Sequence, residues 1–308
     1  MLAIIFPGQG SQSVGMLEEL NEAFPIVREH FDKASSLINI DLWDIAQNNP
    51  DDKINYTQYT QPILFTAGYA CYEIFKQEIG VKADYFAGHS LGEYTALAVS
   101  GALSFEEGVK LVFERGKIMQ DAVSFGSGAM AAVLGLDNKA VAEICQAIGD
   151  VYPANFNCTG QVVIGGKTPQ VEKAIAMAKE KGAKKAVFLP VSVPSHTPLM
   201  KTAAARFGIF LDRIQWKEPT APIIFNVDAA EHKDKFAIMS ALGSQLYKPV
   251  LWRDCVVNLA EKGVKEFIEI GAGKVLCGLI KRIDKNLKAT HIDSPNSLEE
   301  AKKFLAGE

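Results

Sequence analysis

Short apolar runs alternate along this chain with longer amphipathic stretches, and few folds are compatible with that alternation. The run 2–6 ends at Pro7-Gly8 and is typical of a strand buried in a parallel sheet. A second run, 85–87, ends in a turn flanked by glycines and leads into a helical stretch. Strands that alternate with helices in this way predict an α/β fold whose parallel sheet carries helices on both faces.

Two long helices are predicted from the residues at their ends. Gln61-Pro62 is expected to open the first helix, and Gly80 supplies its end. Ser104 with Glu107 three positions later is a capping box, which predicts the start of the second helix. Apolar residues recur along one side of each stretch, as expected for helices that pack on a sheet.

The middle of the chain has a different order of elements and is predicted to form a separate unit. Periodicity and caps place a strand, helix, strand, strand, helix and strand at 130–134, 137–149, 151–157, 161–164, 168–182 and 185–189. Asp137 is expected to cap the first of these helices, and Thr168 the second. This order is the split βαβ arrangement. We therefore predict a small ferredoxin-like subdomain at about 125–192, inserted in a discontinuous α/β domain of 1–124 and 193–308.

Composition narrows the classes of partner. The 308 residues are 48% hydrophobic and carry a formal net charge of -4, which suits a compact globular protein without an overall positive field for nucleic acid or anionic membrane. The 5 cysteines are scattered without a CxxC pair, so neither a zinc site nor a disulfide framework is predicted. Such scattered cysteines fit a reducing cytoplasm best, so we expect a cytoplasmic protein. No stretch has the roughly 20 apolar residues of a membrane span, and we expect a soluble one.

A serine in a sharp turn is the first candidate for chemistry. Gly88-His89-Ser90-Leu91-Gly92 matches G-x-S-x-G between a predicted strand and a helix, the context in which this motif forms a nucleophile elbow. The flanking glycines let the backbone turn tightly, and the N–H of Leu91 is placed to donate to developing negative charge. The alternative is a chance match, which is common in a chain with 25 glycines.

A nucleophilic serine needs a base, and histidine is the usual one because its ordinary pKa is roughly 6.5. His196 lies in the proline-rigid loop 193–198, at the seam between the two predicted units, and is the candidate base. Of the other histidines, His89 adjoins the serine but is expected to point away from it. His30 and His291 lie in segments that look structural, and His232 lies in a charged loop. A hydrogen-bonded surface histidine is the alternative for His196.

Two further residues are candidates for binding. Arg115 lies at the edge of the apolar side of the helix that begins at Ser104, and a full charge there needs an acidic partner. That partner is either an internal carboxylate or the carboxylate of a substrate, which the forked guanidinium would hold. Gln9 lies between two glycines after the first strand, where ligands gather, and is placed to put an amide in the site.

Two glycine-rich segments do not fit nucleotide sites. The spacing that starts at Gly8 breaks at Ser13, where a dinucleotide fingerprint needs its last glycine. Gly271-Ala272-Gly273-Lys274 is followed by Val275, where a Walker loop needs serine or threonine. Hydride transfer and nucleotide hydrolysis therefore lose support.

Taken together, the motifs closely resemble those of the malonyl-CoA:acyl-carrier-protein transacylases of fatty acid synthesis, from Phe6 to about Ile283 and in matching order. The matching segments are Phe6-Pro7-Gly8-Gln9-Gly10-Ser11-Gln12, Gly88 to Tyr94, Arg115-Gly116 with Met119-Gln120, Asn157 with Gly160 to Ile164, Val193 to His196, and Gln245-Leu246-Tyr247 with Pro249-Val250. Two departures are Ala272, where many relatives carry proline, and Cys158-Thr159, which replaces a more usual Ser-Pro pair.

The resemblance implies a role for each candidate residue. Ser90 would be the nucleophile and His196 the base, and the main-chain carbonyl of Gln245 would orient His196. Arg115 would clamp the malonyl carboxylate. Gln9 and the Leu91 amide would surround the oxyanion. The family fold is a hydrolase-like core with a ferredoxin-like insertion, in agreement with the periodicity.

The resemblance also implies a reaction and its partners. A malonyl group would pass from malonyl-CoA to the phosphopantetheine thiol of acyl carrier protein through a malonyl-serine intermediate. No cofactor is expected, because the coenzyme A thioester is a substrate, and we expect a monomer with neither nucleic-acid nor membrane partners. The alternatives are a polyketide-pathway acyltransferase, a serine ester or thioester hydrolase, and a non-enzymatic carrier-binding paralogue.

Overall fold

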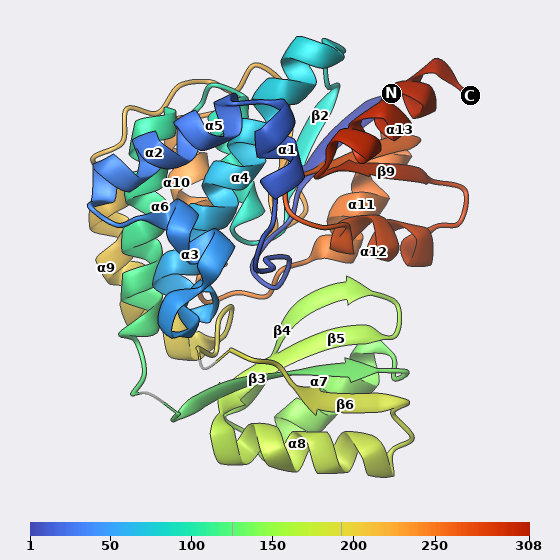
Figure 1. The fold of residues 1–308 in the computed structure, drawn as a ribbon. Helices are drawn as coiled ribbons and strands as arrows, with labels where there is room; N and C mark the ends of the chain where they lie inside the picture. Colours follow the sequence, from blue (N-terminus) through green and yellow to red (C-terminus); the bar gives the residue numbers. More distant parts are fainter. Residues whose placement is uncertain (125, 192) are drawn as a thin grey trace.

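Two sheets organise the molecule, and the larger one is parallel. The computed structural model describes residues 1–124, 126–191 and 193–308. Neighbouring strands of the larger sheet run parallel in the order β7-β2-β1-β8-β9 (Figure 1). The strands span Ile223–Ile224 (β7), Tyr85–Gly88 (β2), Leu2–Phe6 (β1), Glu266–Ile270 (β8) and Lys288–Ile292 (β9). The predicted α/β class with a parallel sheet is confirmed.

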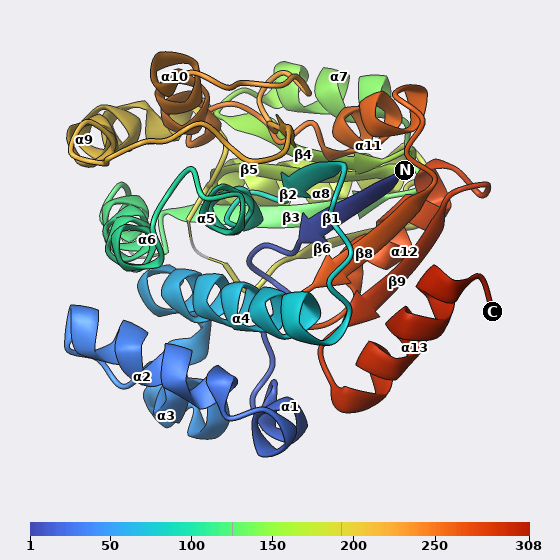
Figure 2. The same ribbon diagram turned by 90° about the horizontal axis from the view of Figure 1, so that it is seen from above.

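Successive residues of β1 point to opposite faces of the sheet, and each face meets its own helical layer. Leu2, Ile4 and Phe6 pack into the core on one face, whereas Ala3 and Ile5 pack into the core on the other. Figure 2 shows the sheet between the two layers. The first layer includes α4 (Thr57–Glu78), α5 (Gly92–Val99) and α13 (Pro295–Ala306), and the second includes α11 (Trp252–Glu261) and α12 (Val275–Ile283).

Further helices extend the first layer outward. They are α1 (Glu18–Ala23), α2 (Ile26–Ile38), α3 (Leu42–Asn48), α6 (Phe105–Gln120), α9 (Lys201–Leu211) and α10 (Lys235–Gln245), with 3-10 turns at Pro50–Asn55 and Pro198–Met200. Ser104 caps α6, as predicted, because its hydroxyl accepts from the Glu107 N–H at 3.2 Å. This cap fixes where α6 begins, and α6 carries Arg115.

The long helix α4 starts earlier than the sequence predicts. It begins at Thr57, so Pro62 lies inside the helix rather than at its start. Because Pro62 has no backbone N–H, the helix lacks one hydrogen-bond donor in its second turn. In the first turn, the Thr60 hydroxyl donates to the Tyr56 carbonyl at 3.0 Å. The predicted end is confirmed, because Gly80, with a φ of 70°, follows the last helical turn.

The second sheet is antiparallel and is built from the middle of the chain. Its strand order is β4-β5-β3-β6, and every neighbouring pair is antiparallel. The elements are β3 (Gly128–Leu134), α7 (Asn138–Ile148), β4 (Val151–Cys158), β5 (Gln161–Lys167), α8 (Thr168–Glu180) and β6 (Lys185–Phe188). They occur in the predicted order. The two predicted limits of this unit, 125 and 192, lie outside the described residues.

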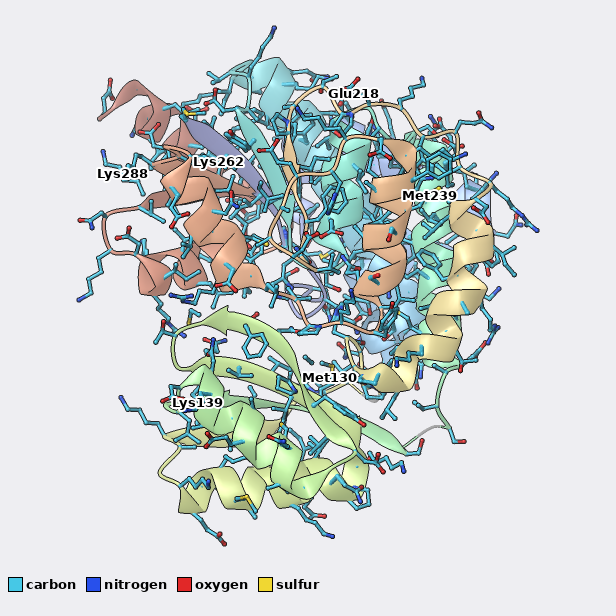
Figure 3. The ribbon with its side chains drawn as sticks, turned by 180° about the vertical axis from the view of Figure 1, so that it is seen from behind. Met130, Lys139, Glu218, Met239, Lys262 and Lys288 are labelled. Atoms are coloured by element: carbon cyan, nitrogen blue, oxygen red, sulfur yellow. The ribbon has the colours of Figure 1, made fainter. Side chains whose placement is uncertain are left out.

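The two helices of this unit cover the same face of its sheet. Apolar side chains of α7 and α8 pack with Ala131 and Val133 of β3 into one core. Met130 points to the opposite face, and Figure 3 shows it beside the junction with the parallel unit. The second sheet therefore turns one side of β3 toward the rest of the molecule.

One of the two helix starts in this unit differs from the prediction. Asp137 caps α7 as predicted, because its carboxylate accepts from the Ala140 N–H at 2.7 Å. Thr168 is the first residue of α8 rather than its cap, and Lys167 precedes the helix. The Thr168 hydroxyl is engaged elsewhere, since it donates to the Gly126 carbonyl at 2.8 Å.

Strand β4 fixes the second sheet to the parallel unit. The N–H of Val250 donates to the Ala154 carbonyl at 2.8 Å, and the N–H of Phe156 donates to the Val250 carbonyl at 2.9 Å. A parallel bridge joins Asn155 to Val250 between them. The face that carries Met130 is thereby held next to the end of β2.

Two further observations concern covalent and membrane features. Within the described ranges, no helix has the length and apolar character needed to cross a bilayer. All five cysteines carry free, buried thiols, and among the described residues no three His, Cys, Asp or Glu side chains form a group suited to a metal ion.

Candidate active site

Ser90 lies at the sharp turn between β2 and α5, in a backbone conformation that few residues adopt. Its φ is 52°, and a non-glycine residue in this left-handed region costs about 1–3 kcal/mol unless its surroundings fix it. The flanking glycines are required by space. A Cβ on Gly88 would lie 1.9 Å from the carbonyl carbon of Gly92, and a Cβ on Gly92 would lie 2.1 Å from the Phe6 oxygen. The turn has the geometry of a nucleophile elbow.

Asn226, which follows β7, holds this turn from the side. Its Oδ1 accepts from the Ser90 N–H at 2.7 Å, and its Nδ2 donates to the Gly88 carbonyl at 2.7 Å. Asn226 is fully buried. Its amide therefore ties down the backbone on both sides of the turn, which is the kind of support that a strained residue needs.

His196 is hydrogen-bonded to Ser90. Its Nε2 lies 2.7 Å from the Ser90 Oγ, and its Nδ1 lies 2.6 Å from the main-chain oxygen of Gln245. Because a carbonyl oxygen only accepts, Nδ1 carries the proton and Nε2 is left to accept from the serine hydroxyl. His196 is 3% exposed, so the alternative of a surface histidine is wrong. The fold brings together two residues that lie 106 positions apart.

Arg115 reaches the same point from α6. Its Nη2 donates to the Ser90 Oγ at 3.2 Å and to the Gln245 Oε1 at 2.8 Å, and its Nη1 donates to the Gln61 Oε1 at 2.8 Å. The guanidinium carbon lies 5.1 Å from the centre of the Tyr94 ring. Arg115 is 1% exposed, and no carboxylate of the described residues lies within ion-pair distance of it. The alternative of an internal salt bridge is therefore wrong.

These groups line a narrow cavity of about 80 Å³ between the two units. Met130 and Val163 of the second sheet form part of its wall, opposite Ser90. A neighbouring cavity of about 200 Å³ shares Gln9 and His89 with the first and extends to the start of α12. The two cavities together form a cleft that contains a hydroxyl, an imidazole and a guanidinium.

Two backbone N–H groups beside the serine donate to no protein group in the described part of the chain. They belong to Leu91, at the start of α5, and to Gln9, in the loop after β1. This loop packs closely on the elbow, since a Cβ on Gly8 would lie 2.3 Å from the His89 oxygen. The Gln9 side chain donates to the Thr57 hydroxyl at 3.2 Å. Fixed, unpaired amide donors of this kind are suited to stabilising an oxyanion.

Burial controls the ionisation of the site. Burial, followed by the charge of Arg115, lowers the pKa of His196 to about 3, so the imidazole is neutral at pH 7 and free to accept a proton. Burial also lowers the pKa of His89. Burial raises the pKa of Glu93, in the first turn of α5, to about 8. At neutral pH, Arg115 is therefore the fixed charge of the cleft, and it favours an anionic ligand.

The other histidines have hydrogen-bond or ion-pair partners outside the Ser90 and His196 pair. The His89 Nε2 lies 2.9 Å from the Asn157 Oδ1. The remaining three contact neighbours within four residues: His30 and the Ile26 carbonyl at 2.8 Å, His232 and Asp228 at 2.9 Å, and His291 and Asp293 at 3.5 Å. Cys158 is buried, and burial raises the pKa of its thiol, so this cysteine has the character of an inert small residue rather than of a reactive thiol.

Sequence reasoning missed three side chains of the site. Asn226 holds the elbow, Gln61 binds Arg115, and the Gln245 side chain both accepts from Arg115 and donates to the Ser90 carbonyl at 3.0 Å. The resemblance had pointed only to the main-chain carbonyl of Gln245. For Gln61 and Gln245 the available signal was an uncharged polar residue within a largely apolar helix, which is a weak one.

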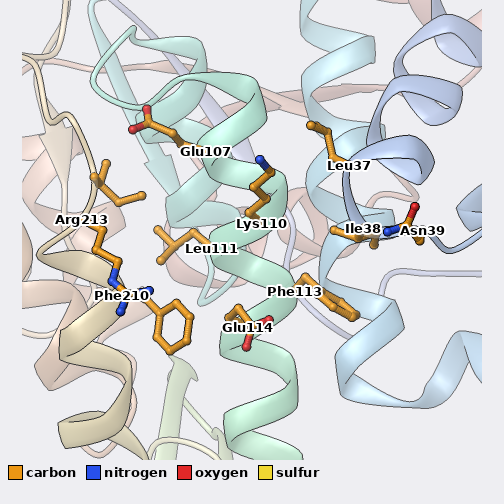
Figure 4. A pocket seen from close by; sticks show the side chains of 11 residues that line it. Leu37, Ile38, Asn39, Glu107, Lys110, Leu111, Phe113, Glu114, Phe210 and Arg213 are labelled. Atoms are coloured by element: carbon orange, nitrogen blue, oxygen red, sulfur yellow. The ribbon is translucent and has the colours of Figure 1, made fainter.

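A larger cavity of about 460 Å³ lies along α6, away from the serine (Figure 4). Its lining comes from α2, α6 and α9 and the residues just after α2 and α9. Leu111 and Phe210 supply apolar surface, and Lys110 and Arg213 supply charge. Among its described lining residues there is no serine, cysteine or histidine. The cleft at Ser90 is thus the candidate active site.

Comparison with known sequences places the chain in one family. The family model for the acyl transferase domain matches residues 3–295. The chain is 46% identical over 302 residues to the malonyl CoA-acyl carrier protein transacylase of Escherichia coli (strain K12), covering 97% of this chain and 98% of that protein. It is 42% identical over 311 residues to the protein of that name from Bacillus subtilis (strain 168), covering 100% and 98%.

Solved structures agree with this placement. The malonyl-CoA:acyl carrier protein transacylase of Xanthomonas oryzae pv. oryzae superposes with a TM-score of 0.96 at 48% identity, over 98% of each chain. A malonyl-transacylase in complex with a type II PKS acyl-carrier protein has a TM-score of 0.96 at 43% identity, over 98% of this chain and 99% of that one. Because the family model and these relatives span nearly the whole chain, the protein belongs to the acyl transferase family and, within it, to the malonyl CoA-acyl carrier protein transacylases.

Proposed function

We propose that this protein transfers a malonyl group from malonyl-CoA to the phosphopantetheine thiol of acyl carrier protein and so supplies fatty acid synthesis. The observation that carries the proposal is the 2.7 Å contact between the Ser90 Oγ and the His196 Nε2, in a cleft that also holds the buried Arg115. The names of the E. coli and B. subtilis relatives supply the substrate and the carrier. The protein is therefore an acyltransferase.

In the first half-reaction, Ser90 attacks the thioester carbonyl of malonyl-CoA. His196 accepts the hydroxyl proton at Nε2, while the Gln245 carbonyl holds the ring through Nδ1. The oxyanion is met by the N–H groups of Leu91 and Gln9. When the tetrahedral intermediate collapses, the carbon–sulfur bond breaks and His196 returns its proton to the coenzyme A sulfur. The products are a malonyl-serine ester and free coenzyme A.

The second half-reaction runs the same chemistry with another thiol. His196 takes the proton of the phosphopantetheine thiol, and the sulfur attacks the malonyl ester on Ser90. The carbon–oxygen bond to the serine breaks, and Oγ regains a proton from His196. The order of events gives ping-pong kinetics, because coenzyme A leaves before the carrier reacts. Neither half-reaction calls for a cofactor, because the imidazole protonates each leaving group and the fixed amides stabilise the oxyanion.

Arg115 is proposed to select the acyl group. A malonyl thioester carries a free carboxylate, and a guanidinium holds a carboxylate through two parallel hydrogen bonds. The Arg115 charge is buried, and its present partners are the uncharged Gln61, Gln245 and Ser90. An acetyl group would leave that charge without an anion, so the site favours malonyl.

The second sheet with α7 and α8 is proposed to be a ferredoxin-like subdomain, inserted in a hydrolase-like core made of 1–124 and 193–308. The element order and the antiparallel strand order β4-β5-β3-β6 support this assignment. Met130 and Val163 of this sheet line the cleft, so the subdomain would cover the malonyl-serine ester. A monomeric, cytoplasmic enzyme stays a prediction.

A transfer assay tests the proposal. Malonyl-CoA and holo acyl carrier protein are mixed with the enzyme, and malonyl carrier is measured by mass spectrometry against time and both substrate concentrations. We expect ping-pong kinetics for the wild type and no transfer above background for Ser90→Ala, whose fold is checked by thermal denaturation. Transfer by Ser90→Ala at the wild-type rate would contradict the proposal.

A polyketide pathway is the second candidate. It is favoured by the structure of a malonyl-transacylase in complex with a type II PKS acyl-carrier protein, which is 43% identical to this chain. The same assay with carriers of both pathways compares them through kcat/KM. A higher value for a polyketide carrier would assign the chain to that pathway, and release of free malonate without carrier loading would instead indicate a hydrolase.

A further inference from the structure

Glu93 is a buried ionisable group that the proposed reaction does not use. It lies in the first turn of α5, three residues after Ser90, and its exposed fraction is 0%. Its Oε2 accepts from the backbone N–H of Asn226 at 2.7 Å. No partner for its other oxygen is found in the described part of the chain. The Gln245 side chain also lies near the Glu93 carboxyl. Placing a carboxyl group here is costly, so its short contact with Asn226 calls for an explanation.

That contact positions the residue that holds the elbow. The Asn226 side chain binds the Ser90 N–H and the Gly88 carbonyl, each at 2.7 Å. Its own carbonyl accepts from the Leu251 N–H at 2.9 Å. Glu93 therefore fixes the remaining backbone group of Asn226. Every hydrogen-bonding group of Asn226 is then engaged, and its amide plane has one orientation.

The elbow depends on this fixation. Ser90 has a φ of 52°, and a non-glycine residue stays in this region only when the surroundings impose it. If Asn226 could rotate or shift, the Ser90 backbone would be free to relax. Its Oγ would then leave the position 2.7 Å from the His196 Nε2. Loss of this alignment would slow the attack of the serine, because the attack requires a fixed geometry.

Resting on the proposed function, we infer that Glu93 is a positioning residue for the nucleophile: its carboxyl group orients Asn226, which holds Ser90 in its strained conformation. Glu93 touches neither the substrate cleft nor the reacting atoms. Its effect should therefore fall on the rate of malonyl-serine formation at saturating malonyl-CoA. Neither the KM nor the preference for malonyl should change.

The hydrogen bond from the Asn226 N–H requires an acceptor oxygen on residue 93 rather than a negative charge. Burial raises the pKa of Glu93 to about 8 against the opposing effect of Arg115, so its carboxyl is neutral at pH 7. The other ionisable groups near Glu93 include Tyr94 on α5, Asp228 after β7 and Cys255 on α11. Glutamine has the same shape and keeps a carbonyl acceptor. Glu93→Gln should thus retain function, whereas Glu93→Ala leaves the Asn226 N–H buried without an acceptor.

The experiment measures acylation in a single turnover. Enzyme is mixed with saturating malonyl-CoA, quenched at short times and analysed by intact mass. We expect Glu93→Ala to form malonyl-serine about 10- to 100-fold more slowly than the wild type. We expect Glu93→Gln to stay within about threefold of the wild type. Leu97→Val is the matched control, because Leu97 is buried on the same helix and its backbone carbonyl accepts from Ser100, Ala102 and Leu103, away from the Ser90 and Asn226 hydrogen bonds. Thermal denaturation compares the stability of the variants.

A double-mutant cycle tests the route through Asn226. If Glu93 acts through Asn226, then adding Glu93→Ala to Asn226→Ala should slow acylation less than about twofold further. Fully additive effects would overturn the inference, as would an acylation rate of Glu93→Ala equal to that of Leu97→Val. If Glu93→Ala does not fold, Glu93→Gln still decides, since a loss of more than about tenfold would show that the charge is needed. Failure of wild-type acylation would instead refute the proposed function.

Discussion

Arg115 allows the proposed selectivity to be estimated from the structure. Its guanidinium is 1% exposed, and its hydrogen bonds go to the uncharged Gln61, Gln245 and Ser90. A malonyl carboxylate would neutralise it, whereas an acetyl group would leave it buried and unpaired. A buried charge without its partner costs about 3–5 kcal/mol. At about 1.4 kcal/mol per tenfold, malonyl should be preferred over acetyl by roughly a hundredfold to a few thousandfold.

Arg115→Ala should abolish most of this preference. Malonyl-CoA and acetyl-CoA compete in one mixture, and the two acyl-enzymes are quantified by intact mass at short times. Arg115 also donates to Ser90, so its loss changes the reactivity of the serine toward both substrates. The ratio of malonyl-enzyme to acetyl-enzyme is insensitive to such a shared change. Lys117→Ala is the matched control, since Lys117 lies on the same helix, is partly exposed and pairs with Glu114. A malonyl-to-acetyl ratio for Arg115→Ala within about threefold of the wild type would refute the clamp.

Two further predictions concern pH and packing. Burial and Arg115 lower the pKa of His196 to about 3, so the kcat/KM for malonyl-CoA should fall on acidification only well below about pH 6.5, the ordinary range of histidine. In Arg115→Ala the midpoint of this fall should move to higher pH. A wild-type pH–rate profile with a midpoint of about 6.5 would contradict the prediction. Gly92→Ala should reduce both the melting temperature and acylation, since the new Cβ would lie 2.1 Å from the Phe6 oxygen, and a variant with wild-type stability and rate would show that this contact is not limiting.

Much of the fold was predictable because its signals are local. The apolar run of β1, the Ser104 cap of α6 and the Asp137 cap of α7 each depend on a few adjacent residues. The start of α4 was predicted wrongly because Pro62 usually opens a helix, whereas here tertiary packing continues the helix one turn earlier. Thr168 was misassigned as a cap because its hydroxyl donates to a distant loop instead.

The candidate site was predictable only in part. Ser90 has a motif, and Arg115 stands out as a charge on an apolar helix face. Asn226 has no such signal, because its role depends on contact with Ser90, which lies 136 positions away. A main-chain carbonyl such as that of Gln245 has no sequence signature at all, so only resemblance to a family could indicate it. Long-range polar contacts of this kind follow from the fold rather than from local pattern.

The most direct test of the mechanism is to locate the covalent intermediate. The enzyme is mixed with malonyl-CoA without carrier, quenched in acid, digested and mapped by tandem mass spectrometry, with Ser90→Ala and His196→Ala alongside. The mechanism predicts one malonyl group on Ser90 in the wild type, none in Ser90→Ala, and formation slowed by about 10²- to 10⁴-fold in His196→Ala. A malonyl group on any other residue, or acylation of His196→Ala at the wild-type rate, would contradict it.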